Sequence, residues 1–378
     1  MTKISARAER WAATMEGHAT ADALVVAHAG ETPWVGPLPI ADRAAREARE
    51  DALLAPGATR AVAAGERLVA EEPDLRRTCF ERDRDRILHS SAFRRLAGKT
   101  QVFVFPDDHQ RTRLTHALEV AQVATAIARA CGLNVALTEA IALGHDCGHG
   151  PGGHASEDAL GAFIPEGYDH AVWGADVVLA PLNLCTQTLD GIRNHSWSRP
   201  APATPEGAVV SWADRCAYSA HDLEDAVSAG IVSTAMLPAV ILERCGATRS
   251  EQLRAFIDGV IEAVGTTGNV GMVGPLAEAL AELRRFNYDH IYLRPASVDQ
   301  SQAVIRVLRA LVEHFADRPQ ALASTGPTVE AGSEEAVRAA VTYVGGMTDR
   351  FAFQTAVAVL GWDPARLPAG VDTSGLRR

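Results

Sequence analysis

Two features are missing from this chain of 378 residues: a long apolar run and a closely spaced cysteine pair. No stretch approaches the roughly 18 consecutive apolar residues that a membrane-spanning helix needs, and the N-terminal sequence MTKISARAERW has no apolar signal core. The six cysteines lie far apart, at Cys79, Cys131, Cys147, Cys185, Cys216 and Cys245. This spacing is typical of buried side chains in a reducing compartment rather than of a disulfide framework. We therefore expect a cytoplasmic protein that does not enter the membrane.

Lysine is also scarce, and the basic residues are unevenly spread. Lys3 and Lys99 are the only lysines, and the net charge of −11 disfavours nucleic acid as a bulk partner. Arginines nevertheless concentrate in one stretch, at Arg76, Arg77, Arg82, Arg84, Arg86, Arg94, Arg95, Arg111 and Arg113. Any one of them could lie on a solvated helix face. As a group they favour an anionic substrate, because guanidinium binds phosphate in a bidentate fork.

Alternating, strand-like patterns are rare, and the run QVFVF at 101–105 is the main exception. Elsewhere apolar residues recur at helical spacing, which predicts an almost all-α fold. We expect residues 1–70 to form a peripheral N-terminal helical segment. Residues 71–316 are expected to form the core, and 317–378 a C-terminal helical segment that packs on it.

Four residues that lie far apart in the sequence have the pattern of one metal site. His116, the adjacent pair His145-Asp146, and Asp214 offer the nitrogen and oxygen ligands that Mn²⁺, Fe²⁺, Mg²⁺ or Zn²⁺ accept. The sequence around the pair, GHDCGHGPGGHASE at 144–157, adds further histidines and a glutamate. A metal beside several titratable groups can activate water against a phosphate ester. The pattern therefore predicts a metal-dependent hydrolytic site.

Local signals place these ligands on three helices. The segment 113–131 has helical periodicity and is followed by Gly132, a residue typical of helix C-termini. Asn134 is a good N-cap for a second helix that ends near the His-Asp pair. Glycines and a proline at 148–153 then predict a tight, irregular connection that returns the following histidines toward the metal. A third helix, 207–230, carries polar residues along one face, so the sequence predicts a helical bundle with its metal site between helices.

Two other kinds of hydrolytic site are excluded. Gly98-Lys99-Thr100 is similar to the end of a phosphate-binding loop, but the glycine required five residues earlier is Phe93, and the order of strand and helix is reversed. No GxSxG elbow is present in the sequence, and Cys147 is better explained as a packing residue than as a nucleophile.

Seven segments of the chain resemble those of a known enzyme family. They are RRTCFERDRDRILHSSAFRRLAGKTQVF (76–103), RTRLTHALEVAQ (111–122), GHDCGHGPGGHASE (144–157), LDGIRNHS (189–196), ADRCAYSAHDLEDA (213–226), YDHIYLRP (288–295) and GGMTDRFA (345–352). Together they resemble the deoxynucleoside triphosphate triphosphohydrolases, or dGTPase-like enzymes, of the HD superfamily. The resemblance implies an all-α HD-domain bundle. It also implies hydrolysis of dGTP or another deoxynucleoside triphosphate to the deoxynucleoside and inorganic triphosphate.

The resemblance further implies roles for individual residues. A divalent ion (Mn, Mg, Fe or Co) would be held by His116, His145, Asp146 and Asp214. The catalytic group would be His154, Glu157 and His149, the last contacting a phosphate together with His170. Substrate contacts would come from Gln101 at the 3′-hydroxyl, Tyr218 and Asp222 at the sugar, and Arg113 and Arg215 at the phosphates. The family also implies a homo-oligomer.

The chain departs from the family pattern in two places. After 168–170 it reads AVWGADVV, where many relatives have a polar Asn-x-Gln-Ser run, and Arg294 stands where histidine is common. These differences leave the preferred base open. Two alternative functions also stay open: an HD-type phosphohydrolase acting on a nucleoside monophosphate or a phosphodiester, and an inactive nucleotide-binding regulator. The presence of both His154 and Glu157 disfavours the regulator.

Overall fold

The computed structural model describes all residues except 1–4, 21–23, 105–109, 323–328 and 369–378. The chain separates into two compact units, Met1–Ala41 and Asp42–Arg378. The first unit contains helix α1 (Ala6–Ala13) and a short antiparallel pair of strands, β1 (His18–Ala19) and β2 (Val25–Val26), in which His18 pairs with Val26. The boundary near residue 70 that we expected from the sequence stays a prediction.

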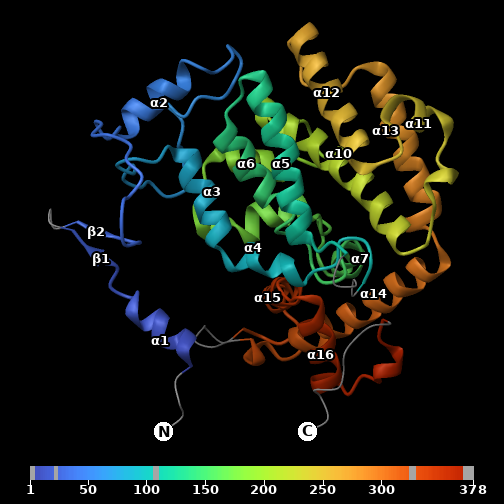
Figure 1. Cartoon of the computed structure of the whole chain (residues 1–378). Coiled ribbons are helices and arrows are strands. Elements are labelled where there is room, and N and C mark those ends of the chain that lie inside the picture. Colours follow the sequence, from blue (N-terminus) through green and yellow to red (C-terminus); the bar gives the residue numbers. More distant parts are fainter. Residues whose placement is uncertain (1–4, 21–23, 105–109, 323–328, 369–378) are drawn as a thin grey trace. The chain divides into compact units, whose positions relative to one another are not determined.

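The second unit is built from helices (Figure 1), and the predicted all-α fold is confirmed. Its helices are α2 (Arg43–Asp51), α3 (Cys79–His89), α4 (Ser91–Arg95), α5 (Arg113–Cys131), α6 (Val135–Gly144), α7 (Ala155–Leu160), α8 (His170–Trp173), α9 (Thr186–Arg193), α10 (Pro205–Ser228), α11 (Ala239–Cys245), α12 (Arg249–Thr267), α13 (Gly274–Asn287), α14 (Pro295–Ala316), α15 (Glu334–Gly345) and α16 (Asp349–Leu360). In the described part of the chain, no helix is both long and apolar enough to cross a membrane.

Three hydrophobic clusters hold these helices together. The first lies where α5 packs against α6 and α10, with α3 on the far side of α6. A second joins α7 to the C-terminal helices α14, α15 and α16. The third joins the C-terminal half of α10 to α11, α12 and α13. The loop between α6 and α7 therefore runs from the first cluster to the second.

The predicted ends of the first two site helices are confirmed. α5 spans Arg113–Cys131 and ends at Gly132, whose backbone is left-handed at φ 65°. Asn134 caps α6, because its side-chain oxygen accepts a hydrogen bond from the backbone N–H of Leu137 at 3.1 Å. The third helix, α10, is a little longer at its N-terminus than expected: it begins at Pro205, with Thr204 as its cap. Proline suits a first helical position, where no backbone N–H is needed.

The predicted strand at 101–105 is wrong over its described part. Residues 101–104 form an irregular bend, and Phe105 lies outside the described residues. An isolated bridge between Thr100 and Thr112 is the pairing that the structure shows next to this segment. A strand needs a neighbouring strand to satisfy its backbone groups, and the described part of the second unit offers none. The side chains of Gln101, Val102 and Val104 instead line a cavity.

The glycines between α6 and α7 allow very close packing. A Cβ atom on Gly148 would lie 2.0 Å from the carbonyl oxygen of His170, which no side chain could tolerate. Gly152 has a left-handed backbone at φ 74°, and a Cβ there would lie 2.4 Å from the side chain of Val304 on α14. The predicted irregular connection is confirmed, and it packs closely between the first and second hydrophobic clusters.

A buried carboxylate joins the segment before α3 to α9. Asp83 is completely buried, and its Oδ1 accepts a hydrogen bond from Arg67, whose side chain is 4% exposed, at 2.6 Å. Its Oδ2 accepts from the backbone N–H of Cys185 at 2.8 Å and from the hydroxyl of Thr188 at 2.7 Å. Three hydrogen-bond donors from separate parts of the chain thus share this one carboxylate as their acceptor.

Replacing Asp83 by alanine should lower the free energy of unfolding by about 3–5 kcal/mol, because Arg67 would remain buried without its counter-charge. Urea denaturation followed by circular dichroism would measure the loss. Asp85→Ala, on the same helix, is the matched control. Asp85 pairs with the more exposed Arg77 and Arg84, so that change should cost less than about 1 kcal/mol. Equal losses in the two variants would contradict the assignment.

Candidate metal centre and its cavity

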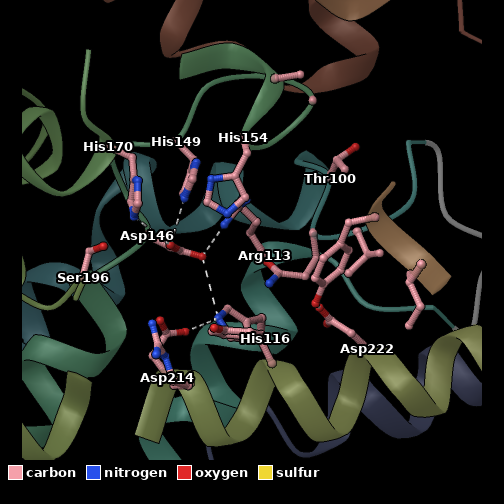
Figure 2. A pocket seen from close by; sticks show the side chains of 18 of the residues that line it. Thr100, Arg113, His116, Asp146, His149, His154, His170, Ser196, Asp214 and Asp222 are labelled. Atoms are coloured by element: carbon pink, nitrogen blue, oxygen red, sulfur yellow. Dashed lines mark hydrogen bonds and ion pairs between the residues drawn. The ribbon is translucent and has the colours of Figure 1, made fainter. Parts of the chain in front are cut away.

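The residues of the H…HD…D pattern meet at one point. His116 comes from the N-terminal end of α5, His145 and Asp146 follow α6, and Asp214 lies on α10. Candidate ligand atoms of His116, His145 and Asp214 all lie within 4.8 Å of one another, and Nε2 of His145 is 3.4 Å from Oδ1 of Asp146. Figure 2 shows His116, Asp146 and Asp214 turned toward one another.

His145 has the donor arrangement of a metal ligand. Its Nδ1 lies 2.7 Å from the carbonyl oxygen of Ala142, which can only accept, so Nδ1 carries the proton. Nε2 is then an unprotonated nitrogen, buried without a hydrogen-bond partner and facing the carboxylates of Asp146 and Asp214 at 3.4 and 3.7 Å. A lone pair directed at two carboxylates is unfavourable unless a cation lies among them. The residues present therefore fit a divalent ion.

Both carboxylates are held ionised. Burial by itself would raise the pKa of Asp146, but the positive charge of Arg113 lowers it well below its usual value. Burial would likewise raise the pKa of Asp214, and the hydrogen bond with His116 lowers it overall. Oxygen ligands for a cation are thus present throughout the neutral pH range.

A second group of side chains lies beside the first, on and after the glycine-rich loop. His149, His154, Glu157 and His170 bring their ligand-type atoms within 4.8 Å of one another. Nδ1 of His154 is 3.0 Å from Oε2 of Glu157, and Nδ1 of His170 is 2.6 Å from Oε1. The ring of His149 stacks on that of His170 at 3.7 Å, and its Nε2 lies 3.2 Å from Oδ1 of Asp146.

Glu157 and His170 each favour the charged form of the other. Burial would raise the pKa of Glu157, but the hydrogen bonds from His154 and His170 lower it strongly. Burial would lower the pKa of His170, yet its hydrogen bond with Glu157 and the negative charge there raise it overall. For His149 burial, Arg113 and His170 all act in one direction, and its pKa is lowered well below its usual value. In the stacked pair, the ring of His149 is therefore neutral, and the ring of His170 holds a proton more tightly than an ordinary histidine does.

Both groups face a cavity of about 460 Å³. The predicted substrate contacts Gln101, Arg113, His170, Arg215, Tyr218 and Asp222 all line it. Arg113 is 2% exposed; its Nη1 donates to Asp146 at 2.5 Å, while Nε and Nη2 are buried without a hydrogen-bond partner. Oε1 of Gln101 is also buried without one. Unpaired buried groups of this kind are costly, and a polar ligand in the cavity would satisfy them.

The sequence matches two protein families that together cover most of the second unit. Residues 113–219 match the HD domain, and residues 270–357 match the phosphohydrolase-associated domain. A deoxyguanosinetriphosphate triphosphohydrolase-like protein from Clostridium perfringens (strain 13) is 41% identical over 298 residues, which are 74% of this chain and 86% of that protein. Proteins of the same description from Caldanaerobacter subterraneus and Desulfatibacillum aliphaticivorans are 39% and 36% identical, over 81% of this chain and 92% and 94% of theirs. The chain belongs to the dGTPase-like family of HD-domain phosphohydrolases.

The sequence analysis of this phosphohydrolase missed His195. Its Nδ1 donates to the carbonyl oxygen of Ile192 at 2.8 Å, and its Nε2 lies 3.3 Å from Nε2 of His170. His195 also forms a possible ligand group with His145 and Asp146. Burial, together with the neighbouring His145 and His170, lowers its pKa to about 4. The available signal was the segment LDGIRNHS, which we used for the family resemblance without assigning its histidine.

Trp197 and Arg284 were missed as well. The guanidinium carbon of Arg215 lies 3.3 Å from the centroid of the Trp197 ring, which is a cation–π contact. Nε of Arg284, on α13, donates to the hydroxyl of Tyr218 at 2.8 Å. Two cavity-lining side chains from two separate segments thus hold Arg215 and Tyr218 in place, and no motif on α10 could have indicated these partners.

The predicted arginine cluster does not face the cavity. Of the nine arginines between 76 and 113, Arg113 alone lines it in the described structure. Arg82 and Arg86 pair with Glu71, and Arg84 pairs with Asp85. Arg111 is buried and contacts Asp222, Asp225 and Glu119, while Tyr292 donates to the other oxygen of Asp222. Nearby carboxylates neutralise these guanidinium groups, and sequence clustering cannot show which partner lies next to each one.

Replacing His145 by glutamine should lower the affinity for Mn²⁺ by at least roughly 10- to 100-fold, because the buried Nε2 donor is lost from the centre. Metal content after gel filtration, measured by inductively coupled plasma mass spectrometry, would show this. His89→Gln is the control, since His89 is exposed on α3 away from the cavity. Full metal occupancy in the His145 variant would rule out this ligand.

Proposed function

We propose that this phosphohydrolase cleaves deoxynucleoside triphosphates, dGTP or others, to the deoxynucleoside and inorganic triphosphate. The observation that carries the proposal is the single cavity. It combines the H…HD…D cluster, the His154–Glu157 pair and the side chain of Arg113, which lines the same space and has two buried donors without a hydrogen-bond partner. Membership of the dGTPase-like family supports the same reaction.

A divalent ion, Mn, Mg, Fe or Co, would be held by His116, His145, Asp146 and Asp214. Such an ion would supply Lewis-acid chemistry there, because it would polarise a phosphoryl oxygen and make a water molecule more acidic. Arg113 supports this centre from the protein side, because its donation to Asp146 at 2.5 Å orients the carboxylate.

His154 is positioned to move the proton of the reaction. Its side chain is 73% exposed, lines the cavity and bonds Glu157 through Nδ1, which leaves Nε2 free to exchange a proton with water or a phosphate oxygen. Glu157 orients the imidazole through this contact. His149, neutral and stacked on His170, would contact a phosphate in the same region.

The phosphate chain carries roughly four negative charges, which the attack of an anionic nucleophile must overcome. Arg113 offers two unused donors, and Arg215 lines the same cavity under the ring of Trp197. Burial lowers the pKa of Arg215, but a guanidinium group keeps its charge at neutral pH. His170, whose pKa is raised, adds a third positive or donating group.

At the sugar end, Gln101, Tyr218 and Asp222 would surround deoxyribose. The unpaired Oε1 of Gln101 can accept a hydrogen bond from the 3′-hydroxyl. The ring of Tyr218, held through its hydroxyl by Arg284, would crowd C2′ and so favour deoxyribose over ribose. Because both oxygens of Asp222 already accept hydrogen bonds from Arg111 and Tyr292, its contact with the sugar would be shared with those partners.

A cytoplasmic location and a homo-oligomeric state form part of the same proposal. The reducing compartment expected from the sequence agrees with the six cysteines, all of which are free. The family resemblance supports the oligomer. The negative net charge disfavours bulk nucleic acid as a partner.

Purified protein supplied with Mn²⁺ or Mg²⁺ should convert at least one of the four deoxynucleoside triphosphates to nucleoside and free triphosphate. Anion-exchange chromatography resolves the products and ranks the bases, and GTP tests discrimination at the sugar. Pyrophosphate with the monophosphate, or phosphate with the diphosphate, would contradict the proposal. Activity on a nucleoside monophosphate or phosphodiester alone would support the alternative HD reaction, and binding without turnover a regulator.

His154→Ala should lower kcat by roughly 10²- to 10⁴-fold, the usual contribution of a positioned acid–base group. Metal content should stay unchanged, because His154 lies outside the H…HD…D cluster. Steady-state kinetics together with metal analysis of the same preparation would separate the two effects. An undiminished kcat would exclude the catalytic role of His154.

A further inference from the structure

We propose that Asp349, assisted by Lys99, is a positioning residue that couples the C-terminal helices α15 and α16 to the glycine-rich loop between α6 and α7. This inference rests on the proposed function, because it concerns the residues that would perform that reaction. Asp349 is the first residue of α16, within the region that matches the phosphohydrolase-associated domain, and it is 4% exposed.

The carboxylate of Asp349 forms hydrogen bonds with two segments that lie far apart in the sequence. Oδ2 accepts hydrogen bonds from the backbone N–H of Thr100, at 2.9 Å, and from the Thr100 hydroxyl. Oδ1 accepts from the backbone N–H of Gly152 at 2.9 Å. Three donors on one buried carboxylate make a rigid link, because each loses its partner if the carboxylate moves.

Each of these two anchor points lies next to a site residue. Thr100 directly precedes Gln101, and Gly152 is separated from His154 by Gly153 alone. The segments also touch, since a Cβ atom on Gly153 would lie 3.1 Å from the carbonyl oxygen of Thr100. Figure 2 shows Thr100 and His154 among the side chains around the cavity. Asp349 therefore determines how far the wall carrying Gln101 stands from the loop carrying His154.

Lys99 makes a second link between the same parts. Its ammonium group is buried and donates to the carbonyl oxygens of His149 and of Gly345, the latter at 2.9 Å. Gly345 is the last residue of α15, so Lys99 connects the start of the glycine-rich loop, at His149, to the C-terminal helices as well. A buried ammonium is expensive to keep away from water, which disfavours a purely space-filling role.

The chain packs closely around the hydrogen bonds of Asp349 and Lys99. A Cβ atom on Gly98 would lie 2.8 Å from the side chain of Thr348, the N-cap of α16. Neither Lys99 nor Asp349 lines the cavity in the described structure, whereas Thr100 and Gly152 do. Both residues would therefore act through the groups they hold, not by touching the substrate.

The test is Asp349→Asn, which keeps the shape of the side chain but turns one acceptor oxygen into a donor. The new NH₂ group would face either the N–H of Gly152 or the N–H of Thr100, so one link must break. Because displacements of about 1 Å can cost about 100-fold in rate, we expect kcat to fall by roughly 10- to 100-fold with metal content unchanged. A milder variant, Thr100→Val, removes the hydroxyl link alone and should cause a smaller fall.

Asp363→Asn is the matched control, because Asp363 is exposed on the same C-terminal region and accepts one local hydrogen bond from the N–H of Ala365. Wild-type kcat and KM in both Asp349→Asn and Thr100→Val would overturn the proposal. An equal fall in kcat in the Asp363 variant would also overturn the proposal, because the loss would then not depend on the hydrogen bonds of Asp349.

Hydrogen–deuterium exchange separates this proposal from the proposed function, because it needs no substrate. In Asp349→Asn, amides of peptides covering 148–157 and 99–104 should exchange faster than in the wild type, while peptides of α12 should not change. Unchanged exchange in the loop peptides would refute the positioning role. Absence of dNTP hydrolysis by the wild type would refute the function and leave this result intact.

Discussion

The structure depends on the enclosure of opposite charges between α5, α6 and α10. Arg113 and Asp146 are both almost entirely buried and are joined at 2.5 Å, with His116 and His145 beside them. Charges removed from water are tolerated only with a close partner. The three helices must therefore keep this arrangement, and a cation among Asp146, Asp214 and His145 would accept the lone pair of His145 Nε2, which the protein itself leaves without a partner.

From this centre the chemistry extends along the glycine-rich loop. Tight approaches at Gly148 and Gly152 bring His149 and His154 over the metal-type residues, and no larger residue would fit at either glycine. The same loop is held by hydrogen bonds from segments remote in sequence, including the hydroxyl of Tyr168, which donates to the carbonyl oxygen of Gly148 at 2.7 Å. Placement of the candidate catalytic groups thus depends on both helical clusters, not on the HD region alone.

Much of the fold and of the metal centre could be predicted from the sequence, because the signals are local. Gly132 and Asn134 mark helix ends through interactions within one turn, and His116 and Asp214 belong to a recognisable pattern. The strand-like pattern was wrong for the described residues 101–104, because alternation describes a strand's faces but not whether a partner strand exists. The arginine cluster was misread for a related reason: charge in a sequence does not show which carboxylates fold against it.

The sequence by itself determined which residues are candidate metal ligands, where α5 and α6 begin and end, and which family the chain resembles. Tertiary structure alone decided that His195 joins the centre, that Trp197 and Arg284 hold the cavity wall, and that Asp349 links Thr100 to Gly152. The physical reason is the separation in sequence over which each kind of interaction acts. Helix propensity and capping act over a few residues, whereas a side chain's partners across the core are set by how whole helices pack.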